Sequence, residues 1–117
     1  IQAVATKEQF IEWQQEVSNI SISDAIFAYV TALTEATRAH TNVQYGISPR
    51  GALALCQYAR ARAFYFGRSF VIPEDIIESF IDVCNHRIVA GAQQQTVSIL
   101  QDILQQVPSP DNMLIGK

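Results

Sequence analysis

Apolar residues recur at helical spacing in five segments of this 117-residue chain, and no segment shows sustained strand alternation. The five segments cover about 6–17, 23–40, 48–66, 73–84 and 98–107. A chain of this length usually forms one domain, and its 49% hydrophobic content is ample for a single core. We therefore predict an all-α fold, a small bundle of about five helices in one domain over residues 1–117, with frayed ends at 1–5 and 109–117.

Capping residues indicate where the predicted helices begin and end. Thr6 and Gln9 form a capping box, in which each side chain binds an exposed backbone N–H of the other residue. Gly67 suits the left-handed conformation that commonly ends a helix. The later helices are predicted to open at Ser23 or Asp24, at Ser48 with Pro49 in the first helical position, at Pro73, and at a second capping box of Ser98 with Gln101.

The apolar stripes of these helices predict the buried residues. Cys56 and Cys84 show no CxxC spacing and no matching pair of histidines, so we expect reduced core thiols and no metal site. The acidic residues of the fourth helix (Glu74, Asp75, Glu78 and Asp82) are expected on its exterior. The predicted stripes are Phe10, Trp13 and Val17; Ile26, Phe27, Val30, Leu33 and Thr37; Ala52, Leu55, Cys56, Ala59, Ala63 and Phe66; Ile77, Phe80, Ile81 and Cys84; and Leu100, Ile103, Leu104 and Val107.

The charge balance argues against a nucleic-acid partner. Eight basic and eleven acidic residues give a formal charge of −3, whereas a duplex-binding surface needs an excess of Lys and Arg. No apolar run approaches the ~18 residues of a membrane span, and no basic segment precedes an apolar one as in a signal peptide. The chain opens with Ile-Gln-Ala instead of Met, so we expect a piece of a longer protein. The two reduced cysteines predict a cytoplasmic location.

The segment Gly46-Ile47-Ser48-Pro49-Arg50 is the strongest candidate for a functional site. A helix N-terminus presents free N–H groups and a partial positive charge, so it attracts anions. An arginine in the same turn is locally unfavourable by roughly 0.3–1 kcal/mol. A bound phosphate would compensate for this, and a guanidinium binds two phosphate oxygens at once. The spacing alone favours a solvated arginine near a loop over an anion site.

Several ordered motifs resemble the helical lid domain of MoxR-type AAA+ ATPases. They are the run from Gly46 to Leu55, Ala59-Arg-Ala-Arg-Ala63, Gly67-Arg68, Val71-Ile-Pro-Glu-Asp75 and His86-Arg87-Ile88. The resemblance covers about residues 15–110. The sequence departs from the family pattern at Ile72, where the usual Thr would cap the fourth helix with its side-chain oxygen.

The resemblance implies that Arg50 is the sensor-2 arginine, a catalytic residue that reaches the phosphates of ATP. Gly46, Ser48 and Pro49 would line the nucleotide beside it. ATP and Mg²⁺ would be held mainly by an α/β core, because this chain has no GxxxxGK[ST] phosphate loop. The isolated chain is therefore not expected to hydrolyse ATP. Family members typically form hexameric rings, act as chaperone-like machines on client proteins, and often work beside proteins with von Willebrand A domains.

Two other interpretations stay open at this point. A histone-fold-like module would explain the long helix followed by Gly-Arg and Val-x-Pro-Glu-Asp-Ile, and a helical adaptor would bind no nucleotide. The lid hypothesis requires Arg50 to be exposed at a helix start. For other basic residues, solvated faces or helix-end dipoles are adequate explanations; these are Arg38 with His40, Arg60, Arg62, Arg68, and His86 with Arg87. An inter-subunit surface is the open alternative for Arg60, Arg62 and Arg68.

Overall fold

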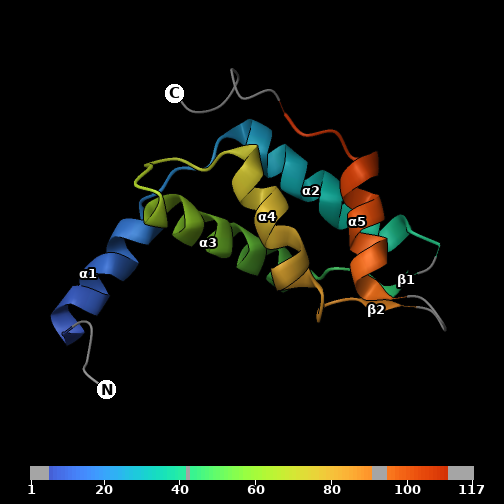
Figure 1. Ribbon diagram of the computed structural model, residues 1–117, viewed down its shortest axis with the longest axis horizontal. Helices are drawn as coiled ribbons and strands as arrows, with labels where there is room; N and C mark the ends of the chain where they lie inside the picture. The colour runs from blue at the N-terminus through green and yellow to red at the C-terminus, as the bar shows by residue number, and fades with distance from the viewer. Residues whose placement is uncertain (1–5, 42, 91–94, 111–117) are drawn as a thin grey trace.

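The computed structural model describes residues 6–41, 43–90 and 95–110, and in these ranges it contains five helices and two short strands. The all-α prediction is therefore confirmed. In Figure 1, α4 lies against α3 at the centre, α5 crosses the end of α2, and α1 extends away from the other helices. The elements are α1 (Lys7–Ser18), α2 (Asp24–Ala39), β1 (Val43–Tyr45), α3 (Pro49–Tyr65), α4 (Pro73–Cys84), β2 (Val89–Ala90) and α5 (Thr96–Gln106).

Local capping fixes the starts of the first three helices as predicted. Thr6 and Gln9 form both hydrogen bonds of the capping box at 3.1 Å. The Ser23 side chain accepts from the Ile26 N–H, and Ser48 caps α3 in the same way. After α3 ends, Gly67 adopts a positive φ of 77°, a conformation that a residue with a Cβ rarely adopts.

The start of α5 differs from the prediction. Its N-cap is Gln95, and Ser98 lies inside the first turn, so the predicted second capping box is wrong. The helix begins at Thr96, whose hydroxyl donates to Asn85 Oδ1 at the end of α4 (2.6 Å). A contact with another helix therefore fixes this start, where the sequence suggested a local cap.

The core is made by the facing stripes of α2, α3, α4 and α5. Phe27 and Phe66 were predicted to be buried, but 45% and 56% of their surfaces are exposed. Phe27 follows Ile26, the true core position, by one residue and so points about 100° away from it. Phe66 lies at the C-cap of α3. The fully buried large side chains are Phe80, Ile26, Leu33, Ile47, Leu55, Ile76, Ile99, Leu100, Ile103, Val71, Thr37 and Asp75.

The two cysteines are free and buried, as predicted. Burial raises the pKa of the Cys84 thiol to about 12, since a thiolate is poorly solvated in an apolar core. Cys84 therefore stays protonated and packs as a small apolar residue.

A short antiparallel pair of strands joins distant parts of the chain and was not predicted. Val43 pairs with Ala90, and Tyr45 pairs with Val89, with an irregular register between the two pairs. Strands of three and two residues are too short to show alternation, so only their pairing reveals them. The pair brings the segment before α3 beside the segment after α4.

The α1 helix contributes no buried residue. Phe10 and Trp13 lie on its exposed surface, so they are not part of this core, although their spacing is typical of one. The helix contacts α3, and the structure describes nothing that covers its other faces. The frayed ends were predicted at 1–5 and 109–117, and apart from residues 109 and 110 they lie outside the described residues.

Candidate functional site

The backbone of Ile47 fixes the segment before α3 against the end of α2. Its N–H donates to Thr37 Oγ1 (2.9 Å), and its carbonyl accepts from Arg38 Nε (3.1 Å). The Ile47 side chain is buried in the core. Because the side chain and both polar backbone groups have partners, the start of α3 has a defined position relative to α2.

Gly46 passes so close to α2 that a side chain would not fit. A Cβ placed on Gly46 would lie 2.8 Å from both the Cα and the backbone nitrogen of Arg38. These are backbone atoms of a helix, which cannot move aside as a flexible side chain can. The close approach therefore requires glycine. It gives Gly46 a positioning role, and its contact with a nucleotide stays a prediction.

Ser48, Pro49 and Arg50 form the opening of α3. The Ser48 hydroxyl accepts a hydrogen bond from the Gly51 N–H (3.1 Å), and Pro49 occupies the first helical turn. The Arg50 side chain is exposed, as the lid hypothesis requires. Within the described part of the chain it has no hydrogen bond or ion pair, and the first turn holds no acidic residue. Its charge thus adds to the positive helix end without a local counter-charge.

A second arginine, Arg87, lies beside the same turn. A Cβ placed on Gly51 would lie 3.4 Å from Arg87 Cδ, so the stem of this side chain passes the start of α3. Arg87 is exposed and follows the end of α4. The sequence suggested only a helix-end role for it. Its position beside the first turn of α3 follows from the packing of α3 against α4, which the sequence motif around Arg50 does not reveal.

This arrangement is suited to binding an anion. An exposed guanidinium next to free helix N–H groups favours phosphate or carboxylate. In the described ranges, no group of three or more His, Cys, Asp or Glu residues is placed to hold a metal ion. The same ranges include no helix that is both long and apolar enough to cross a bilayer.

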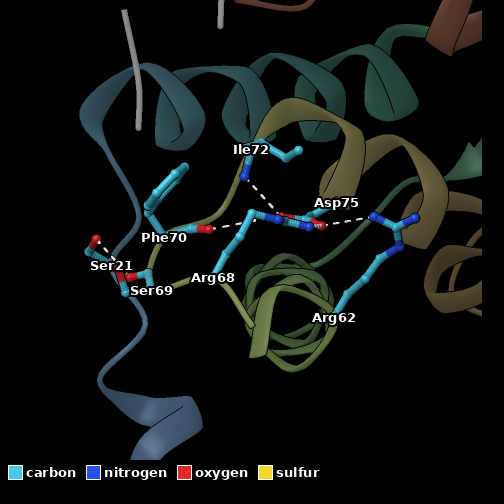
Figure 2. Close-up of polar contacts among 7 residues, drawn as sticks. All are labelled: Ser21, Arg62, Arg68, Ser69, Phe70, Ile72 and Asp75. Carbon is cyan, nitrogen blue, oxygen red and sulfur yellow. Dashed lines mark hydrogen bonds and ion pairs between the residues drawn. The ribbon is translucent and has the colours of Figure 1, made fainter. Parts of the chain in front are cut away.

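The opposite end of α3 holds a buried carboxylate bound by two arginines (Figure 2). Asp75 has no exposed surface. Arg68 binds both of its oxygens, at 2.6 and 2.8 Å, and Arg62 binds Oδ1 at 2.8 Å. The Ile72 N–H donates to Oδ2 (2.9 Å), so Asp75 caps α4 where Ile72 has no side-chain oxygen to do so. Asp75 was predicted on the exterior, and that prediction is wrong.

The protonation of Asp75 follows from these contacts. Burial alone would raise the pKa of this carboxyl, but hydrogen bonds from Arg68, the Ile72 N–H and Arg62 outweigh it and hold the pKa below its usual value. The hydrogen bond to Asp75 also raises the pKa of Arg68. Phe66 lies under both guanidinium groups, with its ring centre 4.9 Å from Arg62 Cζ and 5.8 Å from Arg68 Cζ. Arg62 was expected to be solvated on a helix face, but it forms an ion pair with the buried Asp75.

Other basic residues also have structural partners. Arg60 Nε donates to the carbonyl of Ile20 (3.1 Å) and so links α3 to the segment that follows α1. Arg60 was expected to be solvated, but its guanidinium has this structural partner. His40 Nε2 lies 3.1 Å from Asp102 Oδ2 and links α2 to α5. Arg38 holds the Ile47 carbonyl as described above. These contacts set Arg50 apart from most arginines of the chain.

Residues 35–107 match the AAA lid domain family. The chain is 35% identical over 115 residues to the uncharacterized protein YeaC of Bacillus subtilis, covering 94% of this chain and 36% of that protein. It is 35% identical over 85 residues to the chaperone MoxR1 of Mycobacterium tuberculosis (65% of this chain, 22% of that protein). It is 34% identical over 110 residues to the protein MoxR of Methylorubrum extorquens (78% and 32%).

The fold is also similar to a solved structure. A crystal structure of a candidate ATPase from Cytophaga hutchinsonii superposes with a TM-score of 0.86 at 30% sequence identity, over 94% of this chain and 38% of that one. The chain thus spans between 22% and 36% of the length of the curated relatives it matches.

Proposed function

This chain belongs to the AAA lid domain family, with MoxR-type AAA+ ATPases as its relatives, and from this premise we propose that it closes over ATP held by an adjoining α/β core. Arg50 is the sensor-2 arginine of this proposal. Gly46, Ser48 and Pro49 border the nucleotide beside it. The family match favours this hypothesis over the histone-fold and adaptor alternatives.

The observation that carries the proposal is the state of Arg50. It is exposed at the start of α3, no described residue neutralises it, and the segment before it is fixed to α2 through Ile47. Such a guanidinium fits the phosphates of ATP, because a preorganised positive group stabilises the charge that develops during phosphoryl transfer. Since the segment is fixed, movement of the lid would carry Arg50 toward or away from the nucleotide.

The rest of the ATPase site belongs to the proposed core. The described residues offer no acidic cluster for Mg²⁺, so both Mg²⁺ and most contacts to ATP fall to the core. We further propose neighbouring subunits in a hexameric ring, chaperone-like remodelling of client proteins, a von Willebrand A-domain protein as a partner, and a cytoplasmic location. Among the relatives, the name of the Mycobacterium protein describes a chaperone.

The test is the steady-state ATP turnover of the ATPase that carries this lid. Arg50→Ala is expected to lower turnover by on the order of 10²-fold, as the loss of one preorganised donor does in other enzymes. Arg50→Lys keeps the charge but loses the two-pronged contact, so it should fall between Arg50→Ala and the wild type.

Lys7→Ala is the matched control, because it removes one exposed positive charge from α1, away from the start of α3. Turnover should be unchanged in this variant. Wild-type turnover in Arg50→Ala would rule out the sensor-2 assignment. A gene sequence without a GxxxxGK[ST] loop upstream of Ile1 would rule out the ATPase proposal as a whole.

A further inference from the structure

The outer face of α3 and α4 contains a hollow with exposed aromatic residues around it. Tyr58, Tyr65 and Phe66 from α3 and its C-cap line one side, and Glu78, Ser79 and Asp82 from α4 line the other. We call these six residues the α3–α4 groove. Its volume is about 420 Å³, and Tyr65 is 82% exposed. This much exposed aromatic surface in one place is typical of a binding surface.

The charges of the α3–α4 groove favour a cationic ligand. Glu78 and Asp82 are exposed, and no described residue forms an ion pair with either. Arg62 also borders the hollow and shares the single carboxylate of Asp75 with Arg68, so one positive charge remains there against the two negative charges of Glu78 and Asp82. The groove therefore keeps a net negative charge beside the exposed rings of Tyr58 and Tyr65, and aromatic faces attract Lys and Arg groups.

Ser79 supplies an independent observation. This residue lines the hollow but has no exposed surface. Of the buried side-chain polar atoms in the described ranges, only Ser79 Oγ has no hydrogen-bond partner. Buried polar groups are otherwise almost always paired. A ligand that donates a hydrogen bond, after neighbouring side chains move aside, would satisfy this hydroxyl.

We propose that the α3–α4 groove binds a basic segment of a partner protein and receives one of its Lys or Arg side chains. The alkyl stem lies against Tyr58, Tyr65 and Phe66, and the cationic head faces Glu78 and Asp82. This site is separate from the proposed nucleotide contact. Arg50 and Tyr65 lie fifteen helical residues apart on α3, or roughly 22 Å, so the two proposals fail independently.

The test uses the 117-residue chain and a fluorescein-labelled Gly-Lys-Ala-Lys-Gly peptide at 0.15 M salt, where distant charges are largely screened. The double variant E78Q/D82N is expected to weaken binding about tenfold, or about 1.4 kcal/mol. Tyr65→Ala should weaken it about two- to fivefold through loss of a cation–π contact. Because Tyr65 is largely exposed, its truncation leaves the fold intact.

The matched control is the double variant E8Q/E12Q, which removes the same charge from the exposed surface of α1. It should leave the affinity unchanged. Equal weakening by both double variants, or no effect of Tyr65→Ala, would overturn the proposal in favour of general charge attraction. Amide chemical shifts should change around residues 58–66 and 78–82 on peptide addition, and changes confined to α1 would also overturn it. Sedimentation that shows self-association lost in Tyr65→Ala would assign the groove to a second copy instead.

Discussion

The two ends of α3 use arginine in opposite ways. At its C-terminal end, Arg62 and Arg68 are both committed to Asp75, a carboxylate with no exposed surface. At its N-terminal end, Arg50 is exposed and has no counter-charge among the described residues. The comparison shows that an arginine's role is decided by which acidic groups the fold brings to it. One end stabilises the fold, and the other is available to an anion from outside.

The cluster around Asp75 also shows how one departure in sequence is compensated. Ile72 offers no side-chain oxygen to cap α4, and the Asp75 carboxylate binds its backbone N–H instead. The same carboxylate joins the end of α3 to the start of α4 through Arg62 and Arg68 (Figure 2). Loss of Asp75 would thus release a helix cap and two ion pairs together.

The largest expected effect is therefore on stability, at the C-terminal end of α3. Asp75→Ala should lower the free energy of unfolding by about 3 kcal/mol, near the lower limit for breaking a buried ion pair, because both arginines can still reach water. Urea denaturation of the 117-residue chain measures this. Glu35→Ala, at an exposed position of α2, should change stability by less than about 0.5 kcal/mol. Equal stability of the two variants would contradict the role given to Asp75.

A smaller effect should appear in the way that the free energy of unfolding depends on pH. The pKa of Asp75 is lower in the folded chain than the ~3.9 of an unfolded aspartate, so the unfolded chain binds more protons between these values. Stability from this group is fully present above pH ~4 and is lost as the pH falls through the folded pKa. Between pH 6 and pH 2, the free energy of unfolding should fall less steeply with decreasing pH for Asp75→Asn than for the wild type. Parallel curves would show that Asp75 is not the group responsible.

Features set by neighbouring residues were predictable, and features set by distant ones were not. The caps at Thr6, Ser23 and Ser48 and the turn at Gly67 depend on local chemistry, and all four were predicted. The burial of Asp75 depends on two arginines from other segments, and its place on a polar helix face concealed it. The same applies to the pairing of the two short strands and to Thr96, whose partner lies on α4.

The candidate site follows the same division. The exposure of Arg50 at a helix start could be predicted, because the Ser-Pro pair before it defines that start. The position of Arg87 beside the same turn could not, since it depends on how α4 packs on α3. The reason that Gly46 must be glycine is likewise visible only in its 2.8 Å approach to the backbone of Arg38.

The smallest expected effect is the change in stability on removing Arg50, and it tests the comparison most directly. Arg50→Ala removes no hydrogen bond within the described ranges and relieves a positive charge at a helix N-terminus, which is worth roughly 0.3–1 kcal/mol. The free energy of unfolding should therefore stay the same or rise slightly, in contrast to the loss in Asp75→Ala. A decrease of more than about 1 kcal/mol would mean that Arg50 has a structural partner, as Arg62 and Arg68 do. The two ends of α3 would then be alike, and a fall in ATP turnover in the same variant would no longer identify a phosphate contact.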